Sequence, residues 1–166
     1  GLNILFAGNI GVAQSFDTII EAVKIASKKI KELNIVILGE GRDMDRVQKK
    51  IYNLGLSKNF TFLGSYPPEE MSYFFASSDA LLVTLKKAHI FSLTIPGKLQ
   101  SYLACGKPII GSIDGIASDI INNGKCGFAT ESEDYESLAN SMVKFAKLGY
   151  KERCKLGSNS RIYFER

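Results

Sequence analysis

Short apolar runs alternate with longer segments of helical periodicity along the chain, and this alternation limits the folds that are open to it. The expected strands are Asn3–Ala7, Asn34–Leu38, Asn59–Leu63, Asp79–Leu85, Pro108–Gly111 and Gly127–Thr130. These runs are apolar throughout instead of at every second residue, which indicates strands that are buried on both faces. Strands of this kind, separated by helices, predict a doubly wound, Rossmann-like α/β fold: a parallel sheet of about six strands with helices on both faces.

Between these runs, apolar residues recur at three- and four-residue spacing, and glycine or proline stands at many segment ends. The expected helices are Phe16–Ile30, Asp43–Leu54, a helix beginning at Pro67-Pro68, Pro96–Cys105, Asp114–Asn123, Glu133–Leu148 and Lys151–Arg166. We expect the aromatic run Tyr73–Phe75 to pack in the core. The last helix is expected to be amphipathic, with Cys154, Ile162 and Phe164 as its apolar members. Residues Lys86–Ile95 form a long connection.

Composition places the chain among ordinary globular domains. It has 166 residues, a formal net charge of +4, 45% hydrophobic residues and 23% charged residues. This length is enough for one core, and no linker or internal repeat divides the chain, so we expect one domain, residues 1–166. No apolar run approaches the roughly 20 residues that cross a bilayer, and no signal-peptide pattern opens the chain. The charge falls short of a nucleic-acid-binding signature, so no nucleic-acid partner is expected.

The few cysteines and the single histidine exclude several kinds of chemistry. The three cysteines are scattered, and one histidine cannot form a histidine-based metal cluster. Neither a disulfide framework nor a Ser-His-Asp triad is supported, and no motif contains paired carboxylates. Reduced thiols in a cytoplasmic protein are the simplest interpretation.

In a doubly wound sheet, ligands bind beyond the carboxyl ends of the strands, so the loops that follow strands are the candidate binding segments. These loops are Gly8–Ser15, Gly39–Arg42, Gly64–Pro68, Lys86–Pro96 and Ser112–Gly115. Gly97-Lys98 lacks the upstream glycine and the Ser/Thr of a P-loop, and Gly39-Glu40-Gly41 lacks the third glycine of a dinucleotide fingerprint. The sequence therefore does not match an obvious dehydrogenase or NTPase.

The first of these loops contains two glycines. Gly8 and Gly11 follow the first strand directly and would let backbone amides approach an anion at the positive end of the next helix. A glycine-rich turn that only reverses the chain is the alternative. Glu40, after the second strand, suits either a contact to a ribose hydroxyl or a solvated loop position.

The loop before Pro96 is the second suggestive segment. Proline at a helix start leaves several amides free, Ser92 and Thr94 add hydroxyl groups, and Lys98 adds a cation within the first turn. Together these groups could hold a diphosphate. The alternative is an ordinary capped helix with a surface lysine.

Five stretches occur in a recognisable order: FAGNIGVAQSFDTIIEAV, ILGEGRDMDRV, FTFLGSYPPEEMSYFFASSDALLVTL, IPGKLQSYLACGKPIIGS and DIINNGKCGF. In this order they resemble the C-terminal, donor-binding half of GT-B glycosyltransferases of the large group 1 (family 4) class. The combination of GNIGVAQ with TIPGKLQSYLACGKPI looks most like the subgroup that transfers amino sugars, such as fucosaminyl transferases of bacterial surface polysaccharide pathways. The resemblance covers nearly the whole chain.

The chain departs from this family at its charged positions. Family members typically carry two glutamates eight positions apart that contact the donor sugar and ribose, and the matching residues here are Leu93 and Ser101. Many members place an arginine and a lysine on the donor diphosphate, where this chain has Asn9 and Gln14. We therefore expect Lys98 to supply the missing positive charge.

The resemblance implies a retaining transferase that binds a nucleotide-sugar donor, most simply a UDP-sugar, without a metal ion or other cofactor. The residues expected at the diphosphate are Gly8, Asn9, Gly11, Gln14, Thr94, Ile95, Gly97 and Lys98, with Gly39, Glu40, Phe62, Leu63 and Ser101 at the base and ribose, and Ser92 and Leu93 at the sugar. No catalytic residue can be assigned. The acceptor, a glycan or a lipid-linked sugar, would bind through an N-terminal domain absent from this chain, so the chain alone should be inactive.

Two other functions fit the same architecture. The missing acids at Leu93 and Ser101 also suit a noncatalytic binding module with a degenerate site. A sugar-nucleotide epimerase would need acid–base carboxylates and histidines, of which the chain has few. We expect a cytoplasmic location and leave open whether the full-length protein associates with the inner face of the membrane.

Overall fold

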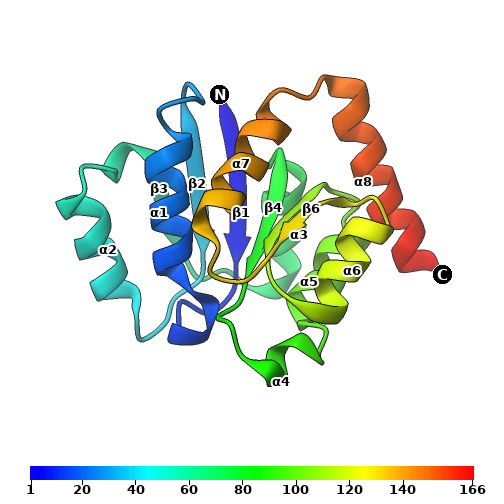
Figure 1. Ribbon diagram of the computed structural model, residues 1–166, viewed down its shortest axis with the longest axis horizontal. Coiled ribbons are helices and arrows are strands. Elements are labelled where there is room, and N and C mark those ends of the chain that lie inside the picture. Colours follow the sequence, from blue (N-terminus) through cyan, green and yellow to red (C-terminus); the bar gives the residue numbers. More distant parts are fainter.

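A computed structural model describes residues 1–166 and contains one six-stranded sheet (Figure 1). The strands are β1 (Leu2–Ala7), β2 (Leu33–Leu38), β3 (Phe60–Gly64), β4 (Ala80–Thr84), β5 (Ile109–Ser112) and β6 (Gly127–Thr130), in the order β3-β2-β1-β4-β5-β6. Every neighbouring pair is parallel. The strand order reverses between β1 and β4, and this confirms the predicted doubly wound sheet.

Helices cover both faces of the sheet. They are α1 (Phe16–Ala26), α2 (Met44–Asn53), α3 (Pro68–Ala76), α4 (His89–Ser92), α5 (Gly97–Ala104), α6 (Gly115–Asn123), α7 (Tyr135–Ala146) and α8 (Tyr150–Glu165), with short 3₁₀ turns η1 (Val12–Gln14) and η2 (Ser57–Asn59). Helices α1, α2 and α7 contribute to the core on one face, whereas α3, α5 and α6 contribute to the core on the other (Figure 1). Helix α8 packs beside α5. No helix is long and apolar enough to span a bilayer.

The central strand β1 shows why the expected strands lack polar alternation. Ile4 and Phe6 point into the core beneath α1, while Leu5 and Ala7 point into the core beneath α5, and all four are buried. Because successive side chains of a strand face opposite sides, a strand that is covered on both sides must be apolar at every position.

Three features of the structure differ clearly from the predictions: the end of α1, the connection after β4 and the burial of one aromatic run. Helix α1 ends at Ala26 instead of Ile30, and the backbone turns through Glu32, whose φ is 57°. The connection Lys86–Ile95 contains the short helix α4. In the run Tyr73–Phe75, Phe75 is buried but Tyr73 is 73% exposed, so only part of this run packs in the core.

Helix α8 does not pack through the three apolar residues that were expected to form its buried face. Ile162 and Phe164 are 53% and 48% exposed and Cys154 is exposed, whereas Gly157 and Ser160 are buried. A Cβ atom at Gly157 would collide with the carbonyl oxygen of Gly106, so the helix backbone lies directly against the turn before β5. Small residues allow this close approach, and a hydrophobic pattern does not reveal it.

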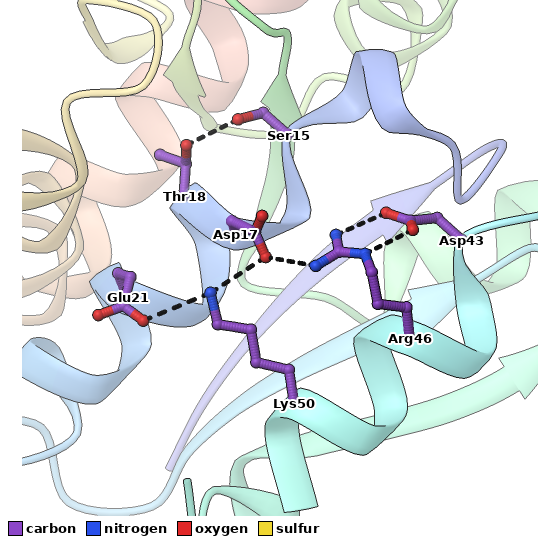
Figure 2. A network of polar contacts seen from close by, with 7 residues as sticks. All are labelled: Ser15, Asp17, Thr18, Glu21, Asp43, Arg46 and Lys50. Carbon is purple, nitrogen blue, oxygen red and sulfur yellow. Dashed lines mark hydrogen bonds and ion pairs between the residues drawn. The ribbon is translucent and has the colours of Figure 1, made fainter. Parts of the chain in front are cut away.

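Ion pairs join α1 to α2 on the outer side of the sheet (Figure 2). The Arg46 guanidinium donates two hydrogen bonds of 2.7 Å to Asp43 and one of 3.0 Å to Asp17, and Lys50 lies 3.1 Å from Asp17 and 3.7 Å from Glu21. The Arg46 hydrogen bonds hold the pKa of Asp43 below its usual value. Because Asp43 ends the loop after β2, this network fixes that loop relative to α1.

Candidate functional site

The loops that follow β1, β2 and β3 contact one another at the carboxyl edge of the sheet. The amide of Gly8 donates to Leu38 O (2.9 Å), the amide of Gly39 donates to Gly64 O (2.9 Å), and the amide of Ile10 donates to Glu40 O (3.0 Å). Gly39 has a φ of +146°, and a Cβ atom there would collide with the Gly8 carbonyl. Only glycine therefore permits this contact between the first two loops.

These loops surround a depression of about 270 Å³. Its lining residues are Gly8, Asn9, Leu38, Gly39, Glu40, Ser65, Tyr66 and Met71. The structure thus brings together four residues that the sequence analysis expected at the donor: Gly8, Asn9, Gly39 and Glu40. Ser65, Tyr66 and Met71 were not singled out, although Ser65 and Tyr66 lie in one of the candidate loops.

Phe62 and Leu63 occupy a different place from these lining residues. Both are half-buried in β3, where Phe62 packs against the core beneath α1 and Leu63 against the core beneath α5. Their side chains do not line the depression. The residues immediately after β3, Ser65 and Tyr66, line the depression instead.

Lys98 lies at the switch point between β1 and β4, in the first turn of α5. Its Nζ atom is 3.8 Å from the centroid of the Phe6 ring and 2.8 Å from the position that a Cβ atom on Gly8 would occupy. The Nζ atom is buried and has no hydrogen-bond acceptor. Gly8 therefore leaves the room in which this ammonium group sits.

The surroundings of Lys98 disfavour its charge. Burial lowers the pKa of Lys98 from 10.5 to about 8. The Phe6 ring offers a cation–π contact, but no carboxylate neutralises the ammonium group. A buried charge without a counterion is costly, and an anion bound here would compensate for it.

The start of α5 adds further donors next to Lys98. Pro96 precedes the helix, and no side chain caps it. The amides of the first turn of a helix have no acceptors within the helix, and the positive end of the helix dipole points in the same direction. Ile95 also donates no hydrogen bond through its amide. Lys98, Gly97 and Ile95 therefore present positive charge and N–H groups on one side of the switch point.

Tyr102 fixes the position of α5. Its hydroxyl group accepts a hydrogen bond from the Ala7 amide (3.0 Å) and donates one to Leu82 O (2.9 Å). β1 and β4 pair only at Ile4–Leu5 with Ala80–Leu81, and beyond that point the strands diverge. The phenol lies between the two strands where they separate, one helical turn after Lys98, so both side chains project from the same face of α5.

The first loop contributes fewer donors than its glycines predict. Besides the Gly8 and Ile10 amides, which donate to carbonyls of the second loop, the Gly11 amide donates to Oε1 of Gln14 (3.0 Å). The expectation that the Gly8 and Gly11 amides face an anion is therefore not met in this structure. Asn9 remains exposed beside the depression.

The residues expected at the donor sugar, Ser92 and Leu93, lie on and after α4, together with Thr94, expected at the diphosphate, and Ser101, expected at the base and ribose. Ser92 Oγ donates to His89 O (2.6 Å), Thr94 Oγ1 donates to Phe91 O (3.3 Å), and Leu93 is 59% exposed. Ser101 is exposed on α5. None of these side chains lines the depression of the first three loops.

Lys87 positions the loop that carries α4. Its Nζ atom lies 3.1 Å from Asp114 and 2.9 Å from Glu131, and its amide donates to Glu133 (2.7 Å). The loops after β4, β5 and β6 are therefore joined through one residue. No group of three His, Cys, Asp or Glu side chains forms a potential metal site.

Comparison with known proteins agrees with this architecture. The family described as "Glycosyl transferases group 1" matches residues 2–163. A GDP-mannose-dependent alpha-(1-6)-phosphatidylinositol monomannoside mannosyltransferase of Mycolicibacterium smegmatis is 22% identical over 129 residues, which are 76% of this chain and 34% of that protein. The chain thus spans about a third of the length of the curated relatives it matches.

Two solved structures have the same fold. HepE of Anabaena, crystallised in complex with UDP, superimposes with a TM-score of 0.83 at 17% identity, covering 99% of this chain and 44% of that one. The C-terminal domain of a group 1 glycosyl transferase family protein (LpcC) from Francisella tularensis superimposes with a TM-score of 0.79 at 21% identity. The match covers 98% of this chain and 83% of that one.

Proposed function

Because this chain belongs to the family of glycosyl transferases group 1, we propose that it is the nucleotide-sugar-binding domain of a retaining glycosyltransferase. The rest of that enzyme would hold the acceptor, a glycan or a lipid-linked sugar of a bacterial surface polysaccharide such as capsule or lipopolysaccharide. The share of the curated relatives that this chain spans supports a division of this kind. The chain alone would bind donor and transfer nothing.

The observation that carries the proposal is the buried ammonium group of Lys98 without a counterion. It lies at the switch point of the sheet, where ligands of doubly wound proteins bind. A diphosphate placed there would accept hydrogen bonds from Nζ and from the free amides at the start of α5. One anion would thus satisfy both a buried cation and an uncapped helix.

The depression beside Gly39 suits the nucleoside part of the donor. Its floor is backbone of the first two loops, Glu40 can accept hydrogen bonds from ribose hydroxyls, and the Tyr66 ring offers a surface for a base. UDP is the donor nucleotide we propose, because structural neighbours with this fold were crystallised with UDP and UDP-glucose.

The same groups would act in the chemical step. When the bond between the anomeric carbon and the diphosphate breaks, negative charge develops on the departing phosphate. Lys98 and the start of α5 are already in place for that charge, so they stabilise the transition state without reorganisation. Cations and amides at this position would make a metal ion unnecessary. The sugar would lie toward Ser92 and Leu93, and the groups that act on the acceptor belong to the other domain.

Calorimetric titration of UDP tests the assignment of Lys98. We expect Lys98→Ala to weaken binding roughly 10- to 100-fold, which corresponds to a hydrogen bond to a charged group of about 1.5–3 kcal/mol. Lys86→Ala is the matched control, because Lys86 is an exposed lysine at the same edge that does not line the depression. Equal affinity in the wild type and Lys98→Ala would exclude Lys98 from the diphosphate site.

Leu93 and Ser101 favour one alternative, a noncatalytic binding module. Both positions lack the carboxylates that the family typically has, and both side chains are exposed. An assay of the full-length protein with UDP-N-acetylhexosamine and membrane-extracted acceptors distinguishes a transferase from a noncatalytic module. Transfer or slow donor hydrolysis supports the enzyme, whereas UDP binding without either supports the module.

A further inference from the structure

A second cavity lies at the edge of the sheet opposite the donor site. It has a volume of about 750 Å³ and is bounded by the start of α8, the end of α5 and the turns that precede β4 and β5. We call it the amino-edge pocket. Its charged and thiol-bearing lining residues are Asp79, Cys105, Lys107, Arg153, Cys154 and Arg161. None of them is used in the proposed function.

Cations dominate this lining, and carbonyl oxygens hold each of them in place. Lys107 Nζ donates to Ser78 O (3.0 Å), and Arg153 Nη2 donates to Ala146 O (3.1 Å). Arg161 Nη1 donates to Ala104 O. A carbonyl oxygen orients a cation but does not neutralise it, so the positive charge of the pocket remains.

Carboxylates offset this charge only in part. Asp79 is the one acid in the lining, and its carboxylate lies 3.9 Å from Arg153 Nη1, beyond hydrogen-bond distance, while it accepts from the Asn3 amide at 2.8 Å. Arg161 pairs with Glu165 at 2.7 Å, but both side chains are more than half exposed, and such pairs are weak. Lys107 has no carboxylate partner.

The start of α8 adds positive potential from a second source. Leu148 and Tyr150 line the pocket, and the helix begins at Tyr150 without a capping side chain. The free amides and the positive end of this 16-residue helix therefore lie in the turn that carries Arg153, whereas Arg161 lies about two turns further along the same helix. Guanidinium and backbone N–H groups of α8 and the ammonium group of the turn before β5 thus line one cavity.

We propose that the amino-edge pocket binds a small phosphorylated molecule, distinct from the nucleotide-sugar donor. One guanidinium group can donate two parallel hydrogen bonds to a phosphate group, and this pocket has two guanidinium groups and one ammonium group in its lining. The volume lies within the range of about 300–1,000 Å³ that is usual for small-molecule sites. Helix α5 runs from Lys98 at the donor edge to Ala104 at this pocket, so the two sites share one helix.

The two exposed cysteines of the pocket give a local measurement of binding. Cys105 and Cys154 line the cavity, whereas Cys126 is buried elsewhere and serves as an internal control. Alkylation by neutral iodoacetamide is followed for each cysteine by peptide mass spectrometry, with inorganic pyrophosphate as the probe and ionic strength held constant. At ten times its Kd, pyrophosphate should slow alkylation of Cys105 and Cys154 about tenfold. No slowing at about 10 mM, well above a weak Kd of about 1 mM, would overturn the proposal.

Variants show whether this protection arises in the pocket. Arg161→Gln and Lys107→Gln should each abolish it, whereas Lys155→Gln, which removes an exposed cation of α8 outside the pocket, should preserve it. Burial raises the pKa of the Cys105 thiol, and Arg161 and Lys107 oppose this rise, so rates with and without pyrophosphate are compared within each variant. Protection that survives both glutamine variants would overturn the proposal.

A last variant separates the pocket from the donor site. Lys98→Ala should leave the protection of Cys105 and Cys154 unchanged, because Lys98 does not line the pocket. Loss of protection in Lys98→Ala would mean that pyrophosphate protects the cysteines by binding at the donor site, and this result would overturn the proposal. The result with Lys98→Ala does not depend on whether UDP binds there.

Discussion

The buried ammonium group of Lys98 lowers the stability of the free protein, and in the proposed complex it would bind the donor diphosphate. Its ammonium group is buried against Phe6 and beneath Gly8, without an acceptor. Residues that bind charged ligands commonly lower the stability of the empty protein, because the site is arranged for a partner that is not yet there. Two predictions follow from the lowered pKa.

The first concerns folding. The pKa of Lys98 is about 8 in the folded protein and 10.5 in the unfolded chain. Between these two pH values the unfolded chain binds more protons than the folded protein, so the free energy of unfolding of the wild type should rise with pH. We expect Lys98→Met to raise the free energy of unfolding at pH 7 by roughly 1–3 kcal/mol, and the advantage to shrink toward pH 10.5. Urea denaturation of both proteins at several pH values measures the difference in their free energies of unfolding. If that difference does not change with pH, the prediction is wrong.

The second concerns ligand binding. If the diphosphate pairs with the Lys98 ammonium group, UDP should bind with uptake of a proton at pH 8 and with falling affinity above that pH. Calorimetry in two buffers of different ionisation enthalpy measures the proton uptake directly. Lys98→Met should show neither effect, and proton uptake that persists in that variant would assign it to another group.

Tyr102 gives a third prediction at this scale. Tyr102→Phe keeps the ring but leaves the Ala7 amide and the Leu82 carbonyl without their partner. Leaving buried polar groups unpaired costs about 1–3 kcal/mol each, so we expect a loss of roughly 2–4 kcal/mol in the free energy of unfolding. Tyr73→Phe is the control, because Tyr73 is 73% exposed. Equal stability of the two variants would show that the Tyr102 hydroxyl is not needed between the strands.

Among the elements, the strands are the most predictable from the sequence. Each is a short apolar run that ends at or near a glycine or polar loop, and no predicted bound differs from the observed one by more than one residue. Helix ends are less predictable, because α1 ends at Ala26 although its apolar periodicity continues to Ile30. The short helix α4 has only four residues, too few for an apolar periodicity to reveal it.

The orientation of α8 shows the limit of hydrophobic patterns most clearly. Its contact with the turn at Gly106 depends on the absence of a side chain at Gly157. The spacing of apolar residues does not reveal a contact that a glycine makes possible. The same limit applies at the donor edge. The sequence places Lys98 at a helix start, but its burial depends on Phe6 and Gly8, which are distant in the sequence.

A substitution in α8 tests this packing. Alanine normally favours a helix over glycine by about 1 kcal/mol, but at Gly157 its Cβ would collide with the Gly106 carbonyl. We therefore expect Gly157→Ala to lower the free energy of unfolding by roughly 1–3 kcal/mol. Phe164→Ser should change it by less than about 0.5 kcal/mol, as is usual for surface positions. A stabilised Gly157→Ala protein would mean that α8 does not lie against that turn.

At the scale of the whole molecule, the two edges of the sheet have different chemistry. The carboxyl edge combines glycine loops, one buried lysine and the start of α5, and sequence reasoning could find it because loops after strands are the general binding positions of such sheets. The amino edge gathers Lys107, Arg153 and Arg161 only through the packing of α8 on α5. No local motif joins these residues, so the pocket could be recognised only in three dimensions.

The phenol of Tyr102 has a further consequence for the donor site. Where parallel strands separate, their unpaired backbone groups ordinarily attract solvent. Here a side chain from the covering helix occupies that gap and satisfies both strands, so the floor beneath Lys98 stays dry. Electrostatic attraction is screened less in a medium of low polarisability. A single lysine above such an insulating floor can therefore attract a diphosphate more strongly than the same lysine would on an open surface.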